Sequence, residues 1–307
     1  MVARLALAPV NWNNDDVPEW GQTLPYAQMP RVAAGLGYAG LEEGTGAPAE
    51  PLRLRDLMAS AGVRLCGSYR WVRLADADLG AAEVEAAVAH ASRLAQAGAD
   101  TLLVAEHWTD ARRAVAGRAA QHPELALGPR ALDHLARNLN RLGRAAADLG
   151  VQVVLHPHVG TPVETAAEMD AVLQATDPAL VGLCLDTGHL VWAGADPLDV
   201  ARRHGRRIRY VHDKDVDRLA LSEAVRQKVG LLDGLRLGVF APLYSTPEER
   251  SAVNMEAVAA VLVAAGFGGW VVMECDRNPR TGNPTREAEV ARPRLERAFA
   301  LPRAGER

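Results

Sequence analysis

The chain has 307 residues, 49% of them hydrophobic, and its formal net charge of −4 argues against the concentrated basic surface that nucleic-acid binding requires. Its three cysteines show no CxxC spacing, which argues against a disulfide framework or a cysteine zinc site and favours a reducing, cytoplasmic setting. The N-terminal apolar run is too short for a signal peptide, and no run reaches the ~18 apolar residues of a membrane span, so we expect a chain that binds neither membranes nor nucleic acid.

Short apolar runs alternate along the chain with longer segments of helical period, a pattern typical of parallel strands joined by crossover helices. The expected strands are 3–10, 38–43, 63–69, 101–106, 151–156, 180–186, 208–213 and 269–275. The expected helices lie near 23–36, 51–61, 79–98, 128–149, 162–176, 196–205, 251–266 and 284–300. Eight strand–helix pairs predict an α/β fold, a single (β/α)8 TIM barrel domain over residues 1–307, with a flexible C-terminal tail at 302–307.

A doubly wound open sheet is the alternative architecture. Such a sheet usually carries a glycine-rich phosphate-binding turn after its first strand, and the segment PVNWNNDD at 9–16 contains no glycine. No repeat, low-complexity tract or linker indicates a second domain. We therefore favour the closed barrel, whose active site lies at the C-terminal ends of the strands.

Histidines and acids close the last four expected strands at that end. The residues are His156, Asp186, His212 and Glu274. Two imidazoles with two carboxylates form a mixed nitrogen and oxygen set, which suits Mn²⁺, Co²⁺, Fe²⁺ or Zn²⁺ better than Mg²⁺ alone. Each residue taken singly could be a buried histidine or a helix-capping acid. Four of them at the same end of consecutive strands indicate a divalent-metal site.

Three further residues follow the expected metal ligands closely. His158 and Lys214 each lie two residues after a histidine, so in an extended strand they face the same side as that histidine. Lys214 also has a structural interpretation, an interior salt bridge with Asp186 or Glu274. His189, three residues past Asp186, is expected to contact substrate or to support a ligand.

The earlier strands end in residues suited to a polyhydroxy substrate. The candidates are Asn11, Trp12 and Asn13 after the first strand, Glu43 after the second, Tyr69 after the third and Glu106 after the fourth. Amide groups donate and accept hydrogen bonds to hydroxyls without adding charge near a metal. Aromatic side chains can form apolar walls beside the C–H faces of a sugar. A helix-capping turn is the alternative interpretation of the acids that follow Asn13.

The segments LHPH, LDTGHLVWAGADP, YVHDKDV and VVMECD, with the opening APVNWNNDD, resemble the xylose-isomerase-like barrels of the sugar phosphate isomerase/epimerase superfamily. The sequence is most similar there to the inosose (2-keto-myo-inositol) dehydratases, over nearly the whole chain. The resemblance implies metal ligands at His156, Asp186, His212 and Glu274. It implies an enzyme of carbohydrate metabolism that acts on a small polyol-derived ketone or sugar with Mn²⁺ or Co²⁺, less readily Fe²⁺, Zn²⁺ or Mg²⁺, and that self-associates as a homodimer or homotetramer.

Two departures from the superfamily pattern bear on the reaction. Epimerases of the superfamily carry a glutamate where this chain has His156, and they exchange a proton from both faces of the substrate with a pair of glutamates. A dehydratase needs no such pair, only one base and one acid. The segment APLYSTPEERSAVNM at 241–255 does not resemble the Pro-Gly-x-Gly loop of dehydratases, which leaves the substrate open.

The leading expectation is a metal-dependent hydro-lyase that dehydrates a polyhydroxy ketone through a metal-bound enediolate. Glu274, or Glu43 if it points inward, would remove the proton, and His158 or Lys214 would assist loss of water. The main alternative is a keto-sugar isomerase or epimerase with the same metal site. A DNA-repair endonuclease would need a second histidine that HDKDVD lacks, and a noncatalytic sugar-binding or scaffold protein is the alternative outside enzymes.

Overall fold

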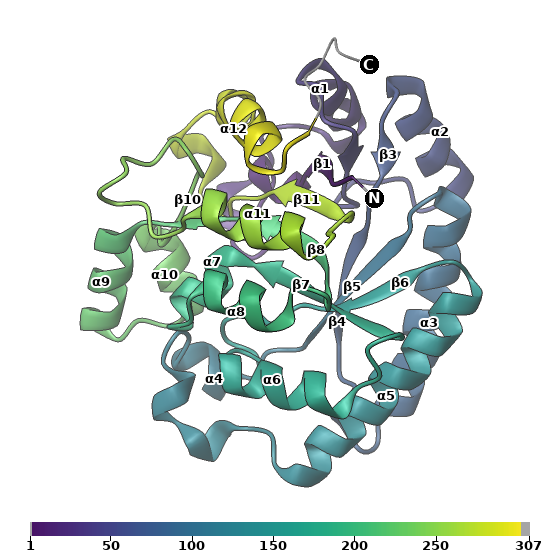
Figure 1. The fold of residues 1–307 in the computed structure, drawn as a ribbon, viewed down its shortest axis with the longest axis vertical. Helices are drawn as coiled ribbons and strands as arrows, with labels where there is room; N and C mark the ends of the chain where they lie inside the picture. Colours follow the sequence, from purple (N-terminus) through teal and green to yellow (C-terminus); the bar gives the residue numbers. More distant parts are fainter. Residues whose placement is uncertain (1, 302–307) are drawn as a thin grey trace.

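A computed structural model describes residues 2–301 of the chain, so the tail expected at 302–307 lies outside the described residues. Its centre is a nine-stranded parallel sheet in the order β3-β2-β1-β11-β8-β7-β6-β5-β4, ringed by helices (Figure 1). The strands are β1 (Arg4–Leu7), β2 (Gly40–Leu41), β3 (Arg64–Leu65), β4 (Ser68–Val72), β5 (Thr101–Glu106), β6 (Gln152–Leu155), β7 (Val181–Asp186), β8 (Ile208–Asp213) and β11 (Trp270–Met273).

The two strands at the ends of this order are consecutive in the chain. Only Cys66 and Gly67 separate β3 from β4, so the backbone itself joins the ends of the sheet, and the nine strands occupy the eight positions of a closed barrel. The expected third strand, 63–69, spans β3 and the start of β4. The expected (β/α)8 barrel is confirmed. The first strand is shorter than expected, because Pro9 opens a 3-10 turn directly after it.

The helices around the barrel match the expected segments. They are α1 (Met29–Gly35), α2 (Pro51–Ala61), α3 (Gly80–Ala97), α5 (Pro129–Asp148), α6 (Ala166–Ala175), α8 (Pro197–His204), α11 (Met255–Ala264) and α12 (Pro284–Ala298). Several begin at a side chain that satisfies free backbone N–H groups, as at Glu50 before α2 and at the capping box of Thr165 and Glu168 before α6. The start of α2 agrees with the expected one, whereas α1, α6 and α11 begin four to six residues after the expected starts.

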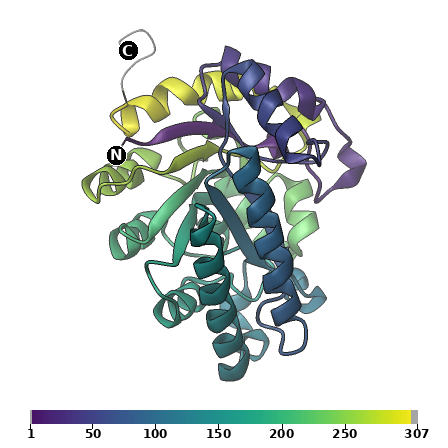
Figure 2. The same ribbon diagram turned by 90° about the vertical axis from the view of Figure 1, so that its right-hand side faces the viewer.

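Helix α5 shows how a surrounding helix is held to the barrel. Its residues Leu135, Leu139, Leu142 and Ala146 recur at helical spacing and are fully buried. Each buried leucine stabilises the fold by about 1.5–3 kcal/mol relative to an exposed one. At Gly143 a Cβ atom would lie 2.7 Å from the carbonyl oxygen of Leu180, so this approach requires glycine. Figure 2 shows α3 and α5 side by side on the outside of the barrel.

The sequence predicts no element between residues 214 and 250, and the structure places a small lobe there. It consists of the antiparallel strands β9 (Asp215–Val216) and β10 (Phe240–Ala241) with the helices α9 (Arg218–Gln227) and α10 (Leu231–Leu237). Two of the apolar residues of α9, Leu219 and Val225, are exposed, which obscures the amphipathic pattern. The short helices α4 (Asp110–Ala114) and α7 (Thr187–Trp192) are also additions to the expected set.

The lobe packs on the barrel through its own apolar cluster, which includes Trp192, Leu231, Leu235 and Phe240. It lies beside the C-terminal ends of β7 and β8, so it borders the end of the barrel where the polar residues gather. Across residues 2–301, every helix is too short or too polar to span a bilayer.

Candidate metal centre

A cavity of about 530 Å³ opens at the C-terminal end of the barrel. Its wall includes the imidazoles of His156, His158, His189 and His212 and the carboxylate of Glu274. These side chains come from the ends of β6, β8 and β11 and from α7, which begins directly after β7. Parallel strands bring their ends to one edge, so residues more than 100 positions apart in the chain share one cavity.

Four potential ligand atoms converge at this end of the barrel, three of them from residues that line the cavity. Nδ1 of His212 lies 2.6 Å from Oε2 of Glu274, 3.1 Å from Nε2 of His156 and 3.5 Å from Oδ2 of Asp186. Nε2 of His156 lies 3.4 Å from the same Asp186 oxygen. The structure therefore brings together all four residues that the sequence predicts as metal ligands.

The unpaired atoms of these residues fit a cation. Oδ2 of Asp186 and Oε2 of Glu274 are buried and accept no hydrogen bond from any described residue. The Asp186 oxygen has an ion-pair partner in Lys214, 3.1 Å away, but neither oxygen uses its full capacity as an acceptor, and a metal ion can satisfy both. Two nitrogen and two oxygen donors within this space match the chemistry of a transition-metal site.

The charges around the four residues favour a positive group between them. Burial raises the pKa of Asp186, but Lys214 and the nearby histidines outweigh it and hold that pKa well below its usual value. Burial likewise opposes ionisation of Glu274, yet His212 and Lys214 bring its pKa to about 2. Burial lowers the pKa of His212, but the carboxylates of Glu274 and Glu42 raise it well above its usual value. The field that holds a proton on His212 would also hold a metal ion.

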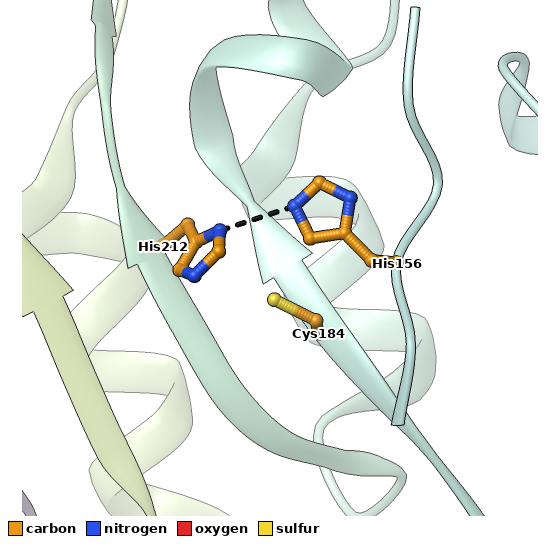
Figure 3. A group of neighbouring side chains, drawn as sticks. All are labelled: His156, Cys184 and His212. Atoms are coloured by element: carbon orange, nitrogen blue, oxygen red, sulfur yellow. Dashed lines mark hydrogen bonds between the residues drawn. The ribbon is translucent and has the colours of Figure 1, made fainter. Parts of the chain in front are cut away.

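Cys184 is a buried neighbour that the sequence patterns did not single out. Figure 3 shows its thiol beside the rings of His156 and His212, and their potential ligand atoms lie within 4.8 Å of one another. Burial raises the pKa of the Cys184 thiol, and a neutral thiol is a poor metal ligand. The carboxylates of Asp186 and Glu274 are therefore better partners for the two histidines. Spacing was the available signal, since Cys184 lies two residues before Asp186 on the same strand.

Lys214 points into the barrel and is completely buried. Its Nζ lies 3.1 Å from Oδ2 of Asp186 and 3.2 Å from Oε1 of Glu274, and it donates a hydrogen bond to Asp276. Asp276, another residue that the sequence patterns did not single out, also lines the cavity. It lies two residues after Glu274, so the alternation of the strand could have indicated it.

His158 and His189 stack on each other with ring centroids 3.7 Å apart. Nδ1 of His158 lies 2.7 Å from the carbonyl oxygen of Val159, so this nitrogen carries the proton and donates, and Nε2 keeps a free lone pair. Nδ1 of His189 accepts a hydrogen bond from the N–H of Val159, and its Nε2 lies 4.0 Å from Oδ2 of Asp186. Burial lowers the pKa of His158 to about 3, so its ring is neutral.

Tyr69 belongs to the cavity wall, where its ring meets that of His156 edge to face at 5.2 Å. Its hydroxyl is buried and has no hydrogen-bond partner within residues 2–301. Trp71 lies beside it with ring centroids 4.9 Å apart and also lines the cavity. The two rings form an apolar wall next to the histidines.

Three residues expected at the substrate have internal partners instead of a place on the described cavity wall. Asn11 donates to the carbonyl oxygen of Met273 at 3.0 Å and accepts from the N–H of Cys275 at 2.8 Å. Trp12 donates to the hydroxyl of Thr285 at 3.2 Å. Glu106 accepts from the backbone N–H groups of Leu74 and Ala75 at 2.7 and 3.2 Å. The physical reason is the same for all three, since each satisfies groups that the barrel would otherwise bury unpaired.

Asn13 and Glu43 line the cavity and also have internal partners. Asn13 donates to the carbonyl oxygen of Leu24 at 2.7 Å and accepts from the N–H of Thr23 at 3.0 Å. Glu43 pairs through Oε1 with Arg93 on α3, and its Oε2 is buried without a hydrogen bond from the described residues. Glu43 therefore lies at the rim, toward α3, and its carboxylate has no ion pair with the four predicted ligands in the described chain.

The glutamate that meets His212 in the barrel interior is Glu42. The sequence patterns singled out its neighbour Glu43 instead. Oε1 of Glu42 lies 2.8 Å from Nε2 of His212 and accepts a hydrogen bond from the hydroxyl of Tyr210 at 2.8 Å. Both glutamates line the cavity, but their partners differ, since Glu42 meets His212 and Tyr210 whereas Glu43 pairs with Arg93 on α3.

Comparisons with known proteins place this site in context. A family model described as xylose isomerase-like TIM barrel matches residues 30–296. Inosose dehydratase of Lacticaseibacillus casei is 30% identical over 305 residues, which is 99% of this chain and 100% of that protein. Inosose dehydratase of Geobacillus thermodenitrificans (strain NG80-2) is 33% identical over 294 residues, 94% of this chain and 95% of that protein. The solved structure of the IOLI protein with a bound zinc atom shares the fold, with a TM-score of 0.65, 13% identity and coverage of 97% of this chain and 98% of that chain.

Proposed function

Because the chain belongs to the xylose isomerase-like TIM barrel family and is similar over its full length to inosose dehydratases, we propose that it is a metal-dependent hydro-lyase that dehydrates a cyclic polyhydroxy ketone. The observation that carries the proposal is the convergence of His156, Asp186, His212 and Glu274 at the C-terminal end of the barrel. Two of their oxygens are buried and accept no hydrogen bond in the described chain, and a divalent ion would satisfy them.

These four residues would hold the ion. Their mixed donor set favours Mn²⁺ or Co²⁺, with Fe²⁺, Zn²⁺ and Mg²⁺ as alternatives. When bound, a divalent ion supplies Lewis-acid polarisation of the substrate carbonyl, which makes the neighbouring C–H more acidic. The IOLI structure, which shares the fold, holds a zinc atom, and this supports a divalent metal in the proposed reaction.

The reaction removes a proton from the carbon next to the carbonyl and a hydroxide from the carbon after it. The hydroxide leaves with a proton as water, and the resulting enol rearranges to a 1,2-dione. The chain must therefore provide one proton acceptor and one proton donor near the substrate.

His158 fits the role of proton acceptor. Its Nδ1 is committed to the carbonyl oxygen of Val159, so Nε2 can accept a proton but has none to give. Glu274 is the other candidate base, although the nearby His212 and Lys214 lower its pKa to about 2 and so weaken it as a base. Glu43 is less suited to this role because it pairs with Arg93 at the rim.

Lys214 and Asp276 fit the role of proton donor. Lys214 carries its protons into the space between Asp186, Glu274 and Asp276. Asp276 lines the cavity and accepts a hydrogen bond from this lysine, so its carboxylate can relay a proton from Lys214 to the leaving hydroxyl. Tyr69 and Trp71 would hold the apolar face of the substrate ring.

Epimerisation by a keto-sugar epimerase is less well supported. It requires a base on each face of the substrate, and the superfamily enzymes that perform it use two glutamates. This chain has His156 at one of those positions, so Glu274 is left without its counterpart.

The direct test is to incubate purified protein, loaded in turn with Mn²⁺, Co²⁺, Fe²⁺, Zn²⁺ and Mg²⁺, with 2-keto-myo-inositol. We expect near-ultraviolet absorbance from the dione product, and mass spectrometry should show the loss of one water. A product of unchanged mass would favour the isomerase or epimerase. No product with any of the metals would contradict the inosose dehydratase assignment.

A further inference from the structure

Glu42 connects two strands that are not neighbours in the barrel. It follows β2, and its carboxylate meets residues of β8, from which β2 is separated in the sheet by β1 and β11. The side chain therefore reaches across the barrel interior at the wall of the cavity. Glu42 is 5% exposed, so its carboxylate is held by protein groups and not by bulk water.

The hydrogen bonds of Glu42 determine which nitrogen of His212 carries a proton. An ionised carboxylate can only accept hydrogen bonds, and its Oε1 lies 2.8 Å from Nε2 of His212. Nε2 must therefore be the protonated nitrogen, which leaves the lone pair of a neutral ring on Nδ1. Nδ1 is the atom that faces His156, Asp186 and Glu274.

Tyr210 holds Glu42 in the position that this arrangement needs. Its hydroxyl is fully buried, donates to the same Oε1 at 2.8 Å and lies 3.3 Å from Sγ of Cys66. Tyr210 lies two residues before His212 on β8, so both side chains point inward from one strand. The Glu42 carboxylate is thus held by Tyr210 and orients His212, and both of these residues lie on β8.

We propose that Glu42 is a positioning residue that fixes His212 in the tautomer and orientation required for metal binding, with Tyr210 as its support. This inference rests on the metal site of the proposed function. Carboxylates that accept from a metal-bound histidine typically contribute 10- to 100-fold to metal affinity. Glu42 touches none of the other three ligands among the described residues, so its contribution passes through His212.

The test is the substitution Glu42→Gln in the full chain. A glutamine can donate through its amide to Nε2 of His212, which stabilises the tautomer with the proton on Nδ1 and blocks the lone pair. We expect Co²⁺ to bind about 10- to 100-fold more weakly than to the wild type, measured by calorimetry and by the visible absorption of bound Co²⁺. The melting temperature of the metal-free variant serves as the control for folding.

Two further variants keep the test decisive. Glu106→Gln makes the same substitution at another glutamate of 5% exposure that follows a barrel strand but binds backbone N–H groups, so its Co²⁺ affinity should equal that of the wild type. Tyr210→Phe retains the Glu42 carboxylate and removes one supporting hydrogen bond, so we expect a smaller loss, about fivefold. This variant also tests the proposal if Glu42→Gln fails to fold.

Unchanged Co²⁺ affinity in Glu42→Gln, or an equal loss in Glu106→Gln, would overturn the role of Glu42. These measurements need no substrate. If the wild type does not dehydrate 2-keto-myo-inositol, the Co²⁺ result still stands. If the wild type is a dehydratase but Glu42→Gln binds Co²⁺ as tightly as the wild type, only this inference is refuted.

Discussion

The ends of β6, β7, β8 and β11 differ from the ends of β1 and β5 in what their polar side chains bind. At the first group, His156, Asp186, His212 and Glu274 face one another and leave carboxylate oxygens without donors. At the second group, Asn11 and Glu106 are satisfied by backbone N–H and C=O groups of neighbouring loops. A polar residue at a strand end is therefore better interpreted by its partners than by its position.

The largest effect should come from removing a ligand at the first group. Asp186→Asn replaces one of the two carboxylates with a neutral amide, so we expect loss of stoichiometric metal binding and a fall in turnover of roughly a thousandfold or more. A chelator should inactivate the wild type to the same extent, with recovery when the metal is returned. Full activity of Asp186→Asn would contradict the placement of the metal centre at this end of the barrel.

His158 tests whether this first group also supplies proton transfer. His158→Phe preserves the stacking on His189 but removes the lone pair of Nε2, so kcat should fall about 10²- to 10⁴-fold with metal content unchanged. Steady-state kinetics with metal analysis measures both quantities. A change confined to KM would make His158 a binding residue and return the proton transfer to Glu274.

Glu106 tests the second group through the pH dependence of stability. Burial raises its pKa from 4.5 to about 7, although hydrogen bonds from Leu74 and Ala75 lower it. The folded state thus binds this proton more tightly than the unfolded chain, and the stabilisation is lost as the pH rises through 7. Relative to the wild type, Glu106→Gln should gain about 3 kcal/mol of unfolding free energy between pH 5 and pH 8.

Urea denaturation at the two pH values measures this gain. The wild type and the variant differ only in whether residue 106 carries a carboxyl group that can release a proton in this pH range. The difference between their two stability profiles therefore reports Glu106 alone. Parallel pH profiles for both proteins would contradict the shifted pKa.

The smallest effect is expected at Asn13, on the loop after β1. Asn13→Ala leaves the N–H groups of Thr23 and Leu24 without their acceptor, so the free energy of unfolding should fall by about 2 kcal/mol with metal content intact. Because Asn13 also lines the cavity, KM is the informative control. A raised KM at unchanged stability would place Asn13 with the substrate-binding residues.

The barrel and its four converging residues could be predicted because both follow from local patterns. Apolar runs mark the strands, and parallel strands end at one edge, so the positions of His156, Asp186, His212 and Glu274 along the chain are enough to group them. The start of α2 after Glu50 agrees with the expected one, whereas α6 begins after Thr165, four residues later than expected. These signals require only the sequence within a few residues of each element.

The roles of Glu42 and Glu43 depend on information that the sequence lacks. Strand β2 has two residues, so its alternation cannot be followed far enough to decide which glutamate faces inward. The choice is made by distant partners, since Arg93 on α3 binds Glu43 and His212 on β8 meets Glu42. The internal partners of Asn11 and Glu106 depend in the same way on the paths of loops far away in the sequence.

The two oxygens of Asp186 serve different purposes. Oδ1 accepts from the N–H of His189 and caps α7, while only Oδ2 faces the other predicted ligands, with Lys214 3.1 Å away as an internal countercharge. The turn from β7 into α7 is therefore complete without an ion. We therefore expect folding to precede metal loading.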